Sequence, residues 1–174
     1  MDYLIISSSL NLKSRSSILA KEAYKKLKDK RVQVQLLDLR RLPLPFCDGD
    51  TCYDHKNTKK LIRKLKKAKC VIIAMPTYNF NSSSSVKNMI ELGGSSWTEK
   101  VVGFLSVAGG VKAYMSVMSP ANSLMLDYRC FIVPRFLYVT RDSFSEDGKI
   151  KDQTISERLD NFVKDAIKFT KALK

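Results

Sequence analysis

The residues best suited to chemistry follow residues 70–75, an apolar run with the length and composition of a buried strand. Pro76 ends this run, and a stretch of small and polar residues continues through Thr77, Tyr78 and Asn79. In an open α/β sheet, a loop of this kind at the carboxyl end of a strand forms the wall of a ligand crevice. Tyr78 can stack on a planar ligand, and Asn79 with the loop amides can hydrogen-bond the polar edge of that ligand. The alternative is that Tyr78 only covers the core and Asn79 only holds a turn.

A second polar loop, residues 7–17, carries six serines together with Asn11, Lys13 and Arg15. Unpaired amides at a helix start, hydroxyl donors and nearby cations together form a phosphate site, because the helix dipole also favours an anion there. A helix cap alone would need only one or two of these residues, so the surplus of donors favours phosphate. The chain has neither the G-x-x-x-x-G-K-[ST] motif of P-loop hydrolases nor the G-x-G-x-x-G dinucleotide fingerprint.

A third loop contains Ser106, Gly109 and Gly110 and follows another apolar run. Glycine lets the backbone approach a ligand closely, although a glycine pair alone is weak evidence for a ligand site. Nucleophilic catalysis finds little support, because the chain has a single histidine, His55, and no G-x-S-x-G elbow. A site with anion and ring contacts but no obvious acid, base or metal indicates that a cofactor performs the chemistry.

These loops require elements that bring them together. The predicted strands are residues 3–6, 32–37, 70–75, 101–107 and 131–139, and the predicted helices are residues 16–28, 58–67, 84–92, 112–128 and 155–173. Their alternation predicts a parallel sheet with right-handed crossovers and helices on both faces. The fold class is therefore α/β: a flavodoxin-like, three-layer, doubly wound sheet of five strands in the order 2-1-3-4-5. Its switch point lies between the first and third strands, so the first two loops should lie side by side.

The length of 174 residues predicts a single domain over residues 1–174, without a linker. No apolar run approaches the roughly 20 residues of a membrane helix, and the start of the chain lacks the basic and apolar regions of a signal peptide. We therefore expect a soluble cytoplasmic protein. The net charge of +14 suggests the hypothesis that the protein binds nucleic acid or an anionic membrane. However, the lysines fall on the polar faces of amphipathic helical segments, which favours solvated helix surfaces and neither partner.

The four cysteines, Cys47, Cys52, Cys70 and Cys130, are interpreted as reduced thiols, because two of them open apolar runs where buried free thiols are common. Cys47 and Cys52 with His55 and the neighbouring aspartates could form a metal cluster. Their spacing matches no C-x-x-C or zinc-finger pattern, so a polar surface loop is the favoured interpretation.

Three segments together resemble the NAD(P)H-dependent FMN reductase family, which includes quinone, azo-dye and chromate reductases. Pro76-Thr77-Tyr78-Asn79 followed by residues 85–91 is similar to the P-E-Y-N…A-L-K-N-A-I-D segment of that family. Residues 8–16 are similar to its G-S-L-R-x-x-S-x-S phosphate loop, and residues 38–45 to the segment after its second strand. The resemblance runs from the first strand to about Tyr128.

The resemblance implies a site for FMN, with a phosphate end and a ring end. It implies that the phosphate is surrounded by Ser9, Asn11, Ser14 and Ser16. It implies that the isoalloxazine is lined by Pro76, Thr77, Tyr78 and Asn79, with Ser106, Gly109 and Gly110 near its pyrimidine edge. Dimers and tetramers are common in the family, so it also implies a homodimer or homotetramer.

Three positions and one turn, the four serines at residues 82–85, depart from the family pattern. Ser8 replaces a glycine, Asn11 replaces the arginine that grips phosphate, and Thr77 replaces a glutamate. Loss of a charge-assisted hydrogen bond costs roughly 1.5–3 kcal/mol, which weakens binding by about one or two orders of magnitude if nothing replaces it. We expect Lys13 to be the substitute.

The leading functional hypothesis is an oxidoreductase that passes hydride from NADPH or NADH to N5 of FMN, and on to a small acceptor. The acceptor classes are a flavin, a quinone, an azo compound or a metal oxyanion, and no catalytic side chain or metal is expected. A flavodoxin-like electron-transfer module that holds FMN but oxidises nicotinamide poorly is the alternative. A degenerate member that has lost flavin and serves as an interaction protein is the third possibility.

Overall fold

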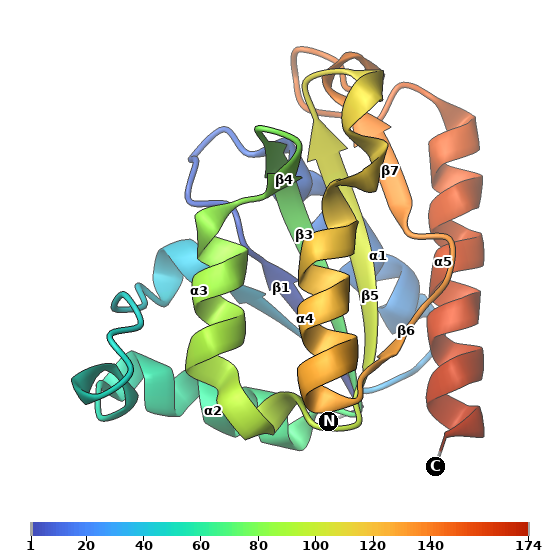
Figure 1. Ribbon diagram of the computed structural model, residues 1–174. Coiled ribbons are helices and arrows are strands. Elements are labelled where there is room, and N and C mark those ends of the chain that lie inside the picture. The colour runs from blue at the N-terminus through green and yellow to red at the C-terminus, as the bar shows by residue number, and fades with distance from the viewer. Residues whose placement is uncertain (1, 174) are drawn as a thin grey trace.

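The computed structural model describes residues 2–173, which form a parallel sheet between two layers of helices (Figure 1). The parallel strands are β1 (Tyr3–Ser7), β2 (Val34–Asp38), β3 (Cys70–Tyr78), β5 (Val101–Ala108), β6 (Phe131–Ile132) and β7 (Leu137–Thr140). Their spatial order is β2-β1-β3-β5, with β6 and β7 both pairing with the outer side of β5. The predicted flavodoxin-like order is thereby confirmed, since β5 is the fourth strand of that order and β6 and β7 share the fifth position.

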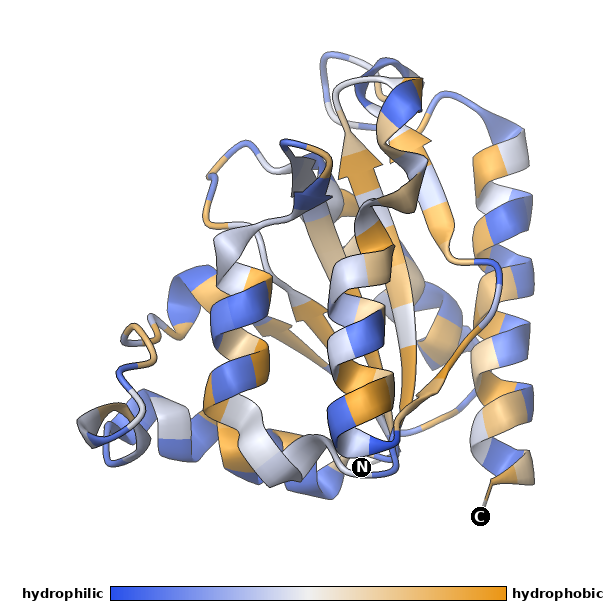
Figure 2. Ribbon diagram, in the orientation of Figure 1, coloured by the Kyte–Doolittle hydropathy of each residue, from blue (hydrophilic) through white to orange (hydrophobic). Residues whose placement is uncertain are grey.

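The helices cover both faces of the sheet. They are α1 (Arg15–Asp29), α2 (Lys56–Lys67), α3 (Ser84–Gly93), α4 (Met118–Tyr128) and α5 (Gln153–Ala172), with short 3-10 helices η1 (Leu39–Arg41), η2 (Thr51–Tyr53), η3 (Gly94–Trp97), η4 (Val111–Val117) and η5 (Arg141–Ser143). Successive strand residues point to opposite faces, so Leu4 packs with α2, α3 and α4, whereas Ile5 packs with α1 and α5. Figure 2 shows the apolar strands enclosed by helices whose outer faces are mainly hydrophilic. None of the helices within residues 2–173 is long and apolar enough to cross a membrane.

The edge strand differs from the prediction, because residues 131–139 do not form one strand. Val102 pairs with Ile132 and Leu105 pairs with Leu137, so three steps along β5 correspond to five along the edge. Two extra residues are therefore accommodated between β6 and β7. Pro134 has no N–H to donate to the sheet, and Arg135 has a φ of 57°, which no regular strand allows.

The third strand also differs from the prediction, because it does not end before Pro76. It runs on to Tyr78 and folds back as an antiparallel hairpin with β4 (Asn81–Ser82), in which Thr77 pairs with Ser82 and Tyr78 with Asn81. The two residues at the tip, Asn79 and Phe80, have φ values of 49° and 60°. Positive φ at both central residues is the signature of a type I′ turn, which suits a two-residue hairpin.

The predicted helix over residues 112–128 is two elements, η4 and α4. Ala113 interrupts η4 with a non-helical ψ of 29°. The remaining predicted strands and helices agree with the observed ones to within two residues at each end.

Replacement of Gly103 by alanine is expected to destabilise the fold by about 1–3 kcal/mol, the cost of overpacking a core. A Cβ at Gly103, in the middle of β5, would lie 2.5 Å from Cζ of Phe162 on α5. Urea denaturation would measure the loss. Gly110→Ala is the matched control, because a Cβ there meets no heavy atom within 4 Å. Equal stability of the two variants would contradict the prediction.

Candidate functional site

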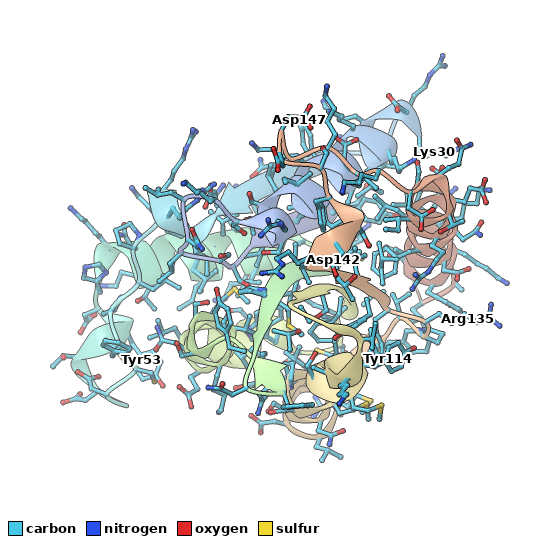
Figure 3. All side chains as sticks on the ribbon, turned by 90° about the horizontal axis from the view of Figure 1, so that it is seen from above. Lys30, Tyr53, Tyr114, Arg135, Asp142 and Asp147 are labelled. Atoms are coloured by element: carbon cyan, nitrogen blue, oxygen red, sulfur yellow. The ribbon has the colours of Figure 1, made fainter. Side chains whose placement is uncertain are left out.

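The carboxyl ends of β1, β3 and β5 meet at one edge of the sheet, where two adjoining depressions open. The first, the serine depression, has a volume of about 170 Å³ and lies between the loop after β1, the end of β3 and Arg141. The second, the hairpin depression, has a volume of about 450 Å³ and lies between the hairpin tip and the loop from Ala108 to η4. Thr77, Ala108 and Gly109 line both, so the two depressions adjoin. Figure 3 looks down on this edge, with the labelled Asp142 of η5 near its centre.

The serine depression is built on the start of α1. Ser14 caps the helix, because its Oγ accepts from the N–H of Ser17 (3.2 Å) and lies 2.9 Å from Oγ of Ser16. The amides of Arg15 and Ser16 precede the capped amide in the first turn, where helix N–H groups have no partner within the helix. The helix dipole adds a partial positive charge at the same point. Amides, hydroxyls and dipole therefore all favour an anion in this depression.

Asn11 shapes the loop of the serine depression. Its Oδ1 accepts from the N–H of Lys13 (2.8 Å), and its own N–H donates to Oγ of Ser9 (3.3 Å). These bonds occupy the oxygen of the Asn11 side chain and leave only its NH₂ group as a donor. Asn11 thus supplies loop geometry, and the cations of the depression come from other positions.

Arg40 ties this loop to the end of β2. Its guanidinium donates to the backbone oxygens of Leu12 (3.2 Å) and Asn11 (3.4 Å) and pairs with Asp38 at 2.5 Å. Burial raises the pKa of Asp38, but the hydrogen bonds and charge of Arg40 outweigh this, and the pKa lies below its usual value. The carboxylate therefore stays charged at neutral pH and holds Arg40 against the loop.

The first and third strand loops lie side by side, as the predicted strand order requires. The N–H and Oγ of Ser8 donate to the backbone oxygen of Ala74 at 2.9 and 3.1 Å. Oγ of Ser85, in the first turn of α3, donates to the backbone oxygen of Ser8 at 2.8 Å. Ser8 is fully buried, so it anchors the loop, and its side chain does not line the depression.

Arg141 is a site residue that the sequence interpretation missed. It begins η5 directly after β7 and lines the serine depression together with Lys13 and Arg15, so three cations face this space. Its side chain is 63% exposed, and its Nε lies 3.7 Å from Oδ1 of Asp142. Its position after the last predicted strand, at the same sheet edge as the other loops, was the signal that could have found it.

A cluster of three buried hydroxyls supports the junction of the two depressions. Oγ1 of Thr77 lies 2.7 Å from Oγ of Ser106 and 2.9 Å from Oγ of Ser116. Ser106 is fully buried behind Thr77 and lines neither depression. Ser116, from η4, was not singled out in the sequence. The cluster connects β3, β5 and η4, which fixes the walls of the site relative to one another.

The hairpin carries the only aromatic residues among those lining the two depressions within residues 2–173. Tyr78, 52% exposed, lines the serine depression, and Asn79 and Phe80 line the hairpin depression. The backbone of Asn79 adopts the left-handed conformation that the hairpin turn requires. Its side chain remains a predicted ligand contact.

The opposite wall of the hairpin depression is the glycine loop. A Cβ added at Gly109 or Gly110 would meet no heavy atom within 4 Å, so the backbone is open to a ligand there. The hydroxyl of Tyr138 on β7 donates to the backbone oxygen of Gly110 and fixes the loop.

Eleven of the twelve predicted site residues line one of the two depressions, and Ser106 is the exception. Their binding of a cofactor stays a prediction. No histidine, cysteine or carboxylate lines either depression within the described part of the chain. Across residues 2–173, no group of three or more His, Cys, Asp or Glu side chains is placed to hold a metal ion.

The chain is similar to several known proteins. The family described as NADPH-dependent FMN reductase matches residues 1–143. An NAD(P)H-dependent FAD/FMN reductase of Geobacillus thermodenitrificans is 28% identical over 131 residues, which cover 74% of this chain and 70% of that protein. An NADPH:quinone oxidoreductase of Arabidopsis thaliana is 24% identical over 136 residues, which cover 74% of this chain and 69% of that protein. Among solved structures, a flavoenzyme NAD(P)H:(acceptor) oxidoreductase from Paracoccus denitrificans superposes with a TM-score of 0.81 at 19% identity, covering 98% of this chain and 97% of that one.

Proposed function

The chain belongs to the NADPH-dependent FMN reductase family, and on that premise we propose that its two depressions hold FMN and react with NADPH or NADH. Membership makes the protein an oxidoreductase. The observation that carries the proposal is that the serine depression, which suits a phosphate, adjoins the hairpin depression, which suits a flat ring.

The phosphate end of FMN fits the serine depression. The start of α1 offers amides, and Ser9, Ser14 and Ser16 offer hydroxyls. Lys13, Arg15 and Arg141 supply positive charge, which offsets the absence of the family arginine at position 11. The donor set thus matches a phosphate monoester in both hydrogen bonding and charge.

The ring end of FMN fits the space that begins at Tyr78 and continues into the hairpin depression. Pro76, Thr77 and Tyr78 form one side, and Asn79, Gly109 and Gly110 border the continuation. The open backbone at the two glycines allows close approach to a polar ring edge. When bound, FMN supplies the chemistry of accepting hydride from nicotinamide and passing electrons to an acceptor.

The protein's own contribution is orientation and electrostatics. No histidine, cysteine or carboxylate lines the depressions within residues 2–173, so we assign the described side chains the roles of binding and positioning. Backbone amides of the glycine loop and the hairpin can donate to negative charge at the ring edge. The buried hydroxyl cluster keeps these walls in register.

The acceptor is a small molecule of the flavin, quinone, azo-compound or metal-oxyanion class, and residues 1–174 act as one FMN-binding domain in the cytoplasm. A homodimer, or a tetramer built from it, completes the site. The rim of the hairpin depression supports this, because Phe80 (70% exposed) and Val111 (75% exposed) are apolar side chains facing solvent. A single species of monomer mass in sedimentation equilibrium would contradict the dimer.

The decisive experiment is the visible spectrum followed by anaerobic mixing with NADPH. We expect the purified protein, loaded with FMN, to show oxidised-flavin absorption that bleaches rapidly on mixing with NADPH or NADH. Absence of bleaching with either nucleotide would favour an electron-transfer module. Absence of flavin after FMN is added would contradict the proposal altogether.

Asn79→Ala is expected to weaken FMN binding more than Asn79→Gly does, because both variants lose the predicted side-chain contact and only alanine also strains the hairpin tip. Left-handed φ costs an ordinary residue roughly 1–2 kcal/mol, so alanine strains the hairpin tip and glycine does not. Fluorescence titration of FMN would measure both variants. Equal loss in the two would show that strain at the hairpin tip does not affect binding, and unchanged affinity in both would contradict the predicted side-chain contact.

A further inference from the structure

Cys47 and Cys52 form a close pair of thiols in the segment between β2 and α2. Their sulfur atoms lie 4.0 Å apart, and both residues are free thiols. Cys52 is buried, whereas Cys47 is half-buried and has its sulfur 3.7 Å from the Tyr53 hydroxyl. In contrast, Cys70 and Cys130 lie in core layers on opposite faces of the sheet. The chain therefore presents one neighbouring pair, of which one member is reachable from solvent.

The turn between the two cysteines holds them together. Gly49 has a φ of 79°, which lets the chain reverse within the four residues between them. The Asp48 carboxylate accepts from the N–H groups of Asp50 (2.9 Å) and Cys52 (3.0 Å) and from the Thr51 hydroxyl (2.5 Å). The N–H of Cys47 is fixed as well, by Oδ1 of Asn88 at 2.8 Å. A disulfide bond of about 2.05 Å requires the two sulfurs to approach by only about 2 Å.

The pair lies away from the proposed flavin site. Figure 3 shows the labelled Tyr53 at the opposite side of the carboxyl edge from Arg135 and well separated from Asp142. Neither Cys47 nor Cys52 lines either depression. A change at these sulfurs would therefore leave the residues that line the depressions chemically intact.

We propose that Cys47 and Cys52 are a redox-modification site, at which a peroxide converts the two thiols to an intramolecular disulfide. The half-buried Cys47 sulfur attacks one peroxide oxygen, which breaks the O–O bond and forms Cys47–SOH. The thiol proton leaves with the other oxygen as an alcohol, or as water in the case of hydrogen peroxide. The Cys52 sulfur then attacks the Cys47 sulfur, its proton leaves with the hydroxyl as water, and the S–S bond forms. Two thiols are oxidised, and one peroxide is reduced by two electrons.

The order of the two steps follows from the surroundings of each sulfur. Burial and the neighbouring Asp48 carboxylate raise the pKa of the Cys52 thiol, so Cys52 stays protonated and shielded at neutral pH. Cys47 is therefore the sulfur that meets the peroxide, and Cys52 is the one that resolves the sulfenic acid.

The test uses the full chain, hydrogen peroxide and mass spectrometry. The tryptic peptide of residues 42–56 contains both cysteines and no other. After peroxide treatment, denaturation and alkylation, we expect this peptide without any alkyl group and lighter by two hydrogen atoms, and alkylated again after reduction. Cys70 and Cys130 should remain fully alkylated. The measurement is made on thiols and needs no flavin, so its result is independent of the proposed oxidoreductase activity.

Three variants make the proposal falsifiable. Cys52→Ser should stop the reaction at Cys47 sulfenic acid, trapped by dimedone, and Cys47→Ser should leave Cys52 open to alkylation. Cys130→Ser, the matched control at a buried thiol that donates to the backbone oxygen of Trp97, should still form the disulfide. The proposal is overturned if peptide 42–56 of the unmutated chain stays alkylated at both cysteines, carries only a sulfinic acid, or is found linked to a second chain.

Discussion

Arg141→Glu is expected to weaken FMN binding by about 100-fold while riboflavin binding stays close to that of the unmutated protein. Arg141 faces the serine depression together with Lys13 and Arg15, and Asn11 supplies no charge. A hydrogen bond to a charged group contributes roughly 1.5–3 kcal/mol, or about 10- to 150-fold in affinity, and the new carboxylate adds repulsion. Riboflavin has no phosphate, so it does not experience either effect.

Fluorescence titration at fixed ionic strength measures both ligands, because salt screens such contacts. Arg63→Glu on α2 is the matched control, since it changes the net charge equally at an exposed position outside both depressions. Arg141→Lys should recover part of the affinity. Equal losses for FMN and riboflavin in Arg141→Glu would place the phosphate elsewhere.

Gly109→Val is expected to lower flavin affinity by about 10- to 150-fold without destabilising the protein. Gly109 lines both depressions, and a Cβ there meets no heavy atom within 4 Å, so a side chain begins in open space. The branched side chain would instead occupy the space proposed for the ring, at a cost of about 1–3 kcal/mol in forced displacement. FMN and riboflavin should lose affinity equally, unlike in Arg141→Glu.

The graded series Gly109→Ala and Gly109→Val provides the control. Loss of flavin affinity should grow with side-chain size, while the urea denaturation midpoint of the ligand-free protein should stay constant. Unchanged affinity in the valine variant would show that the ring does not reach Gly109. A large fall in the ligand-free midpoint would instead indicate a structural role for this glycine.

The sequence predicts the layered sheet well, because the buried strands are continuous apolar runs and the helices are amphipathic. Its failures have local physical causes. The type I′ turn at Asn79 and Phe80 is not predicted, because such turns are usually recognised by an Asn-Gly or Asp-Gly pair and Phe80 stands in place of the glycine. Pro134 breaks an otherwise apolar edge strand, and the start of the predicted fourth helix tightens into η4.

The sequence predicts those site residues that lie together in one segment of the chain. It does not predict those that the fold brings to the site from distant segments. The serine loop and the segment from Pro76 to Asn79 are each contiguous, so their chemistry is visible in the sequence. Arg141 and Ser116 reach the same region from distant parts of the chain. Ser106 follows the strand pattern correctly, but the alternation of strand faces turns its hydroxyl into the buried cluster.

The break between β6 and β7 affects which surfaces two copies of the protein can use to associate. An unbroken outer strand would offer a row of open backbone groups onto which a second chain could extend the sheet, the usual start of aggregation. Between β6 and β7, Pro134 has no backbone N–H to donate. The two extra residues there interrupt the regular spacing of backbone hydrogen-bonding groups along the edge. Sheet extension along this side is thereby blocked, whereas side-chain surfaces such as the apolar rim at Phe80 and Val111 stay open to self-association.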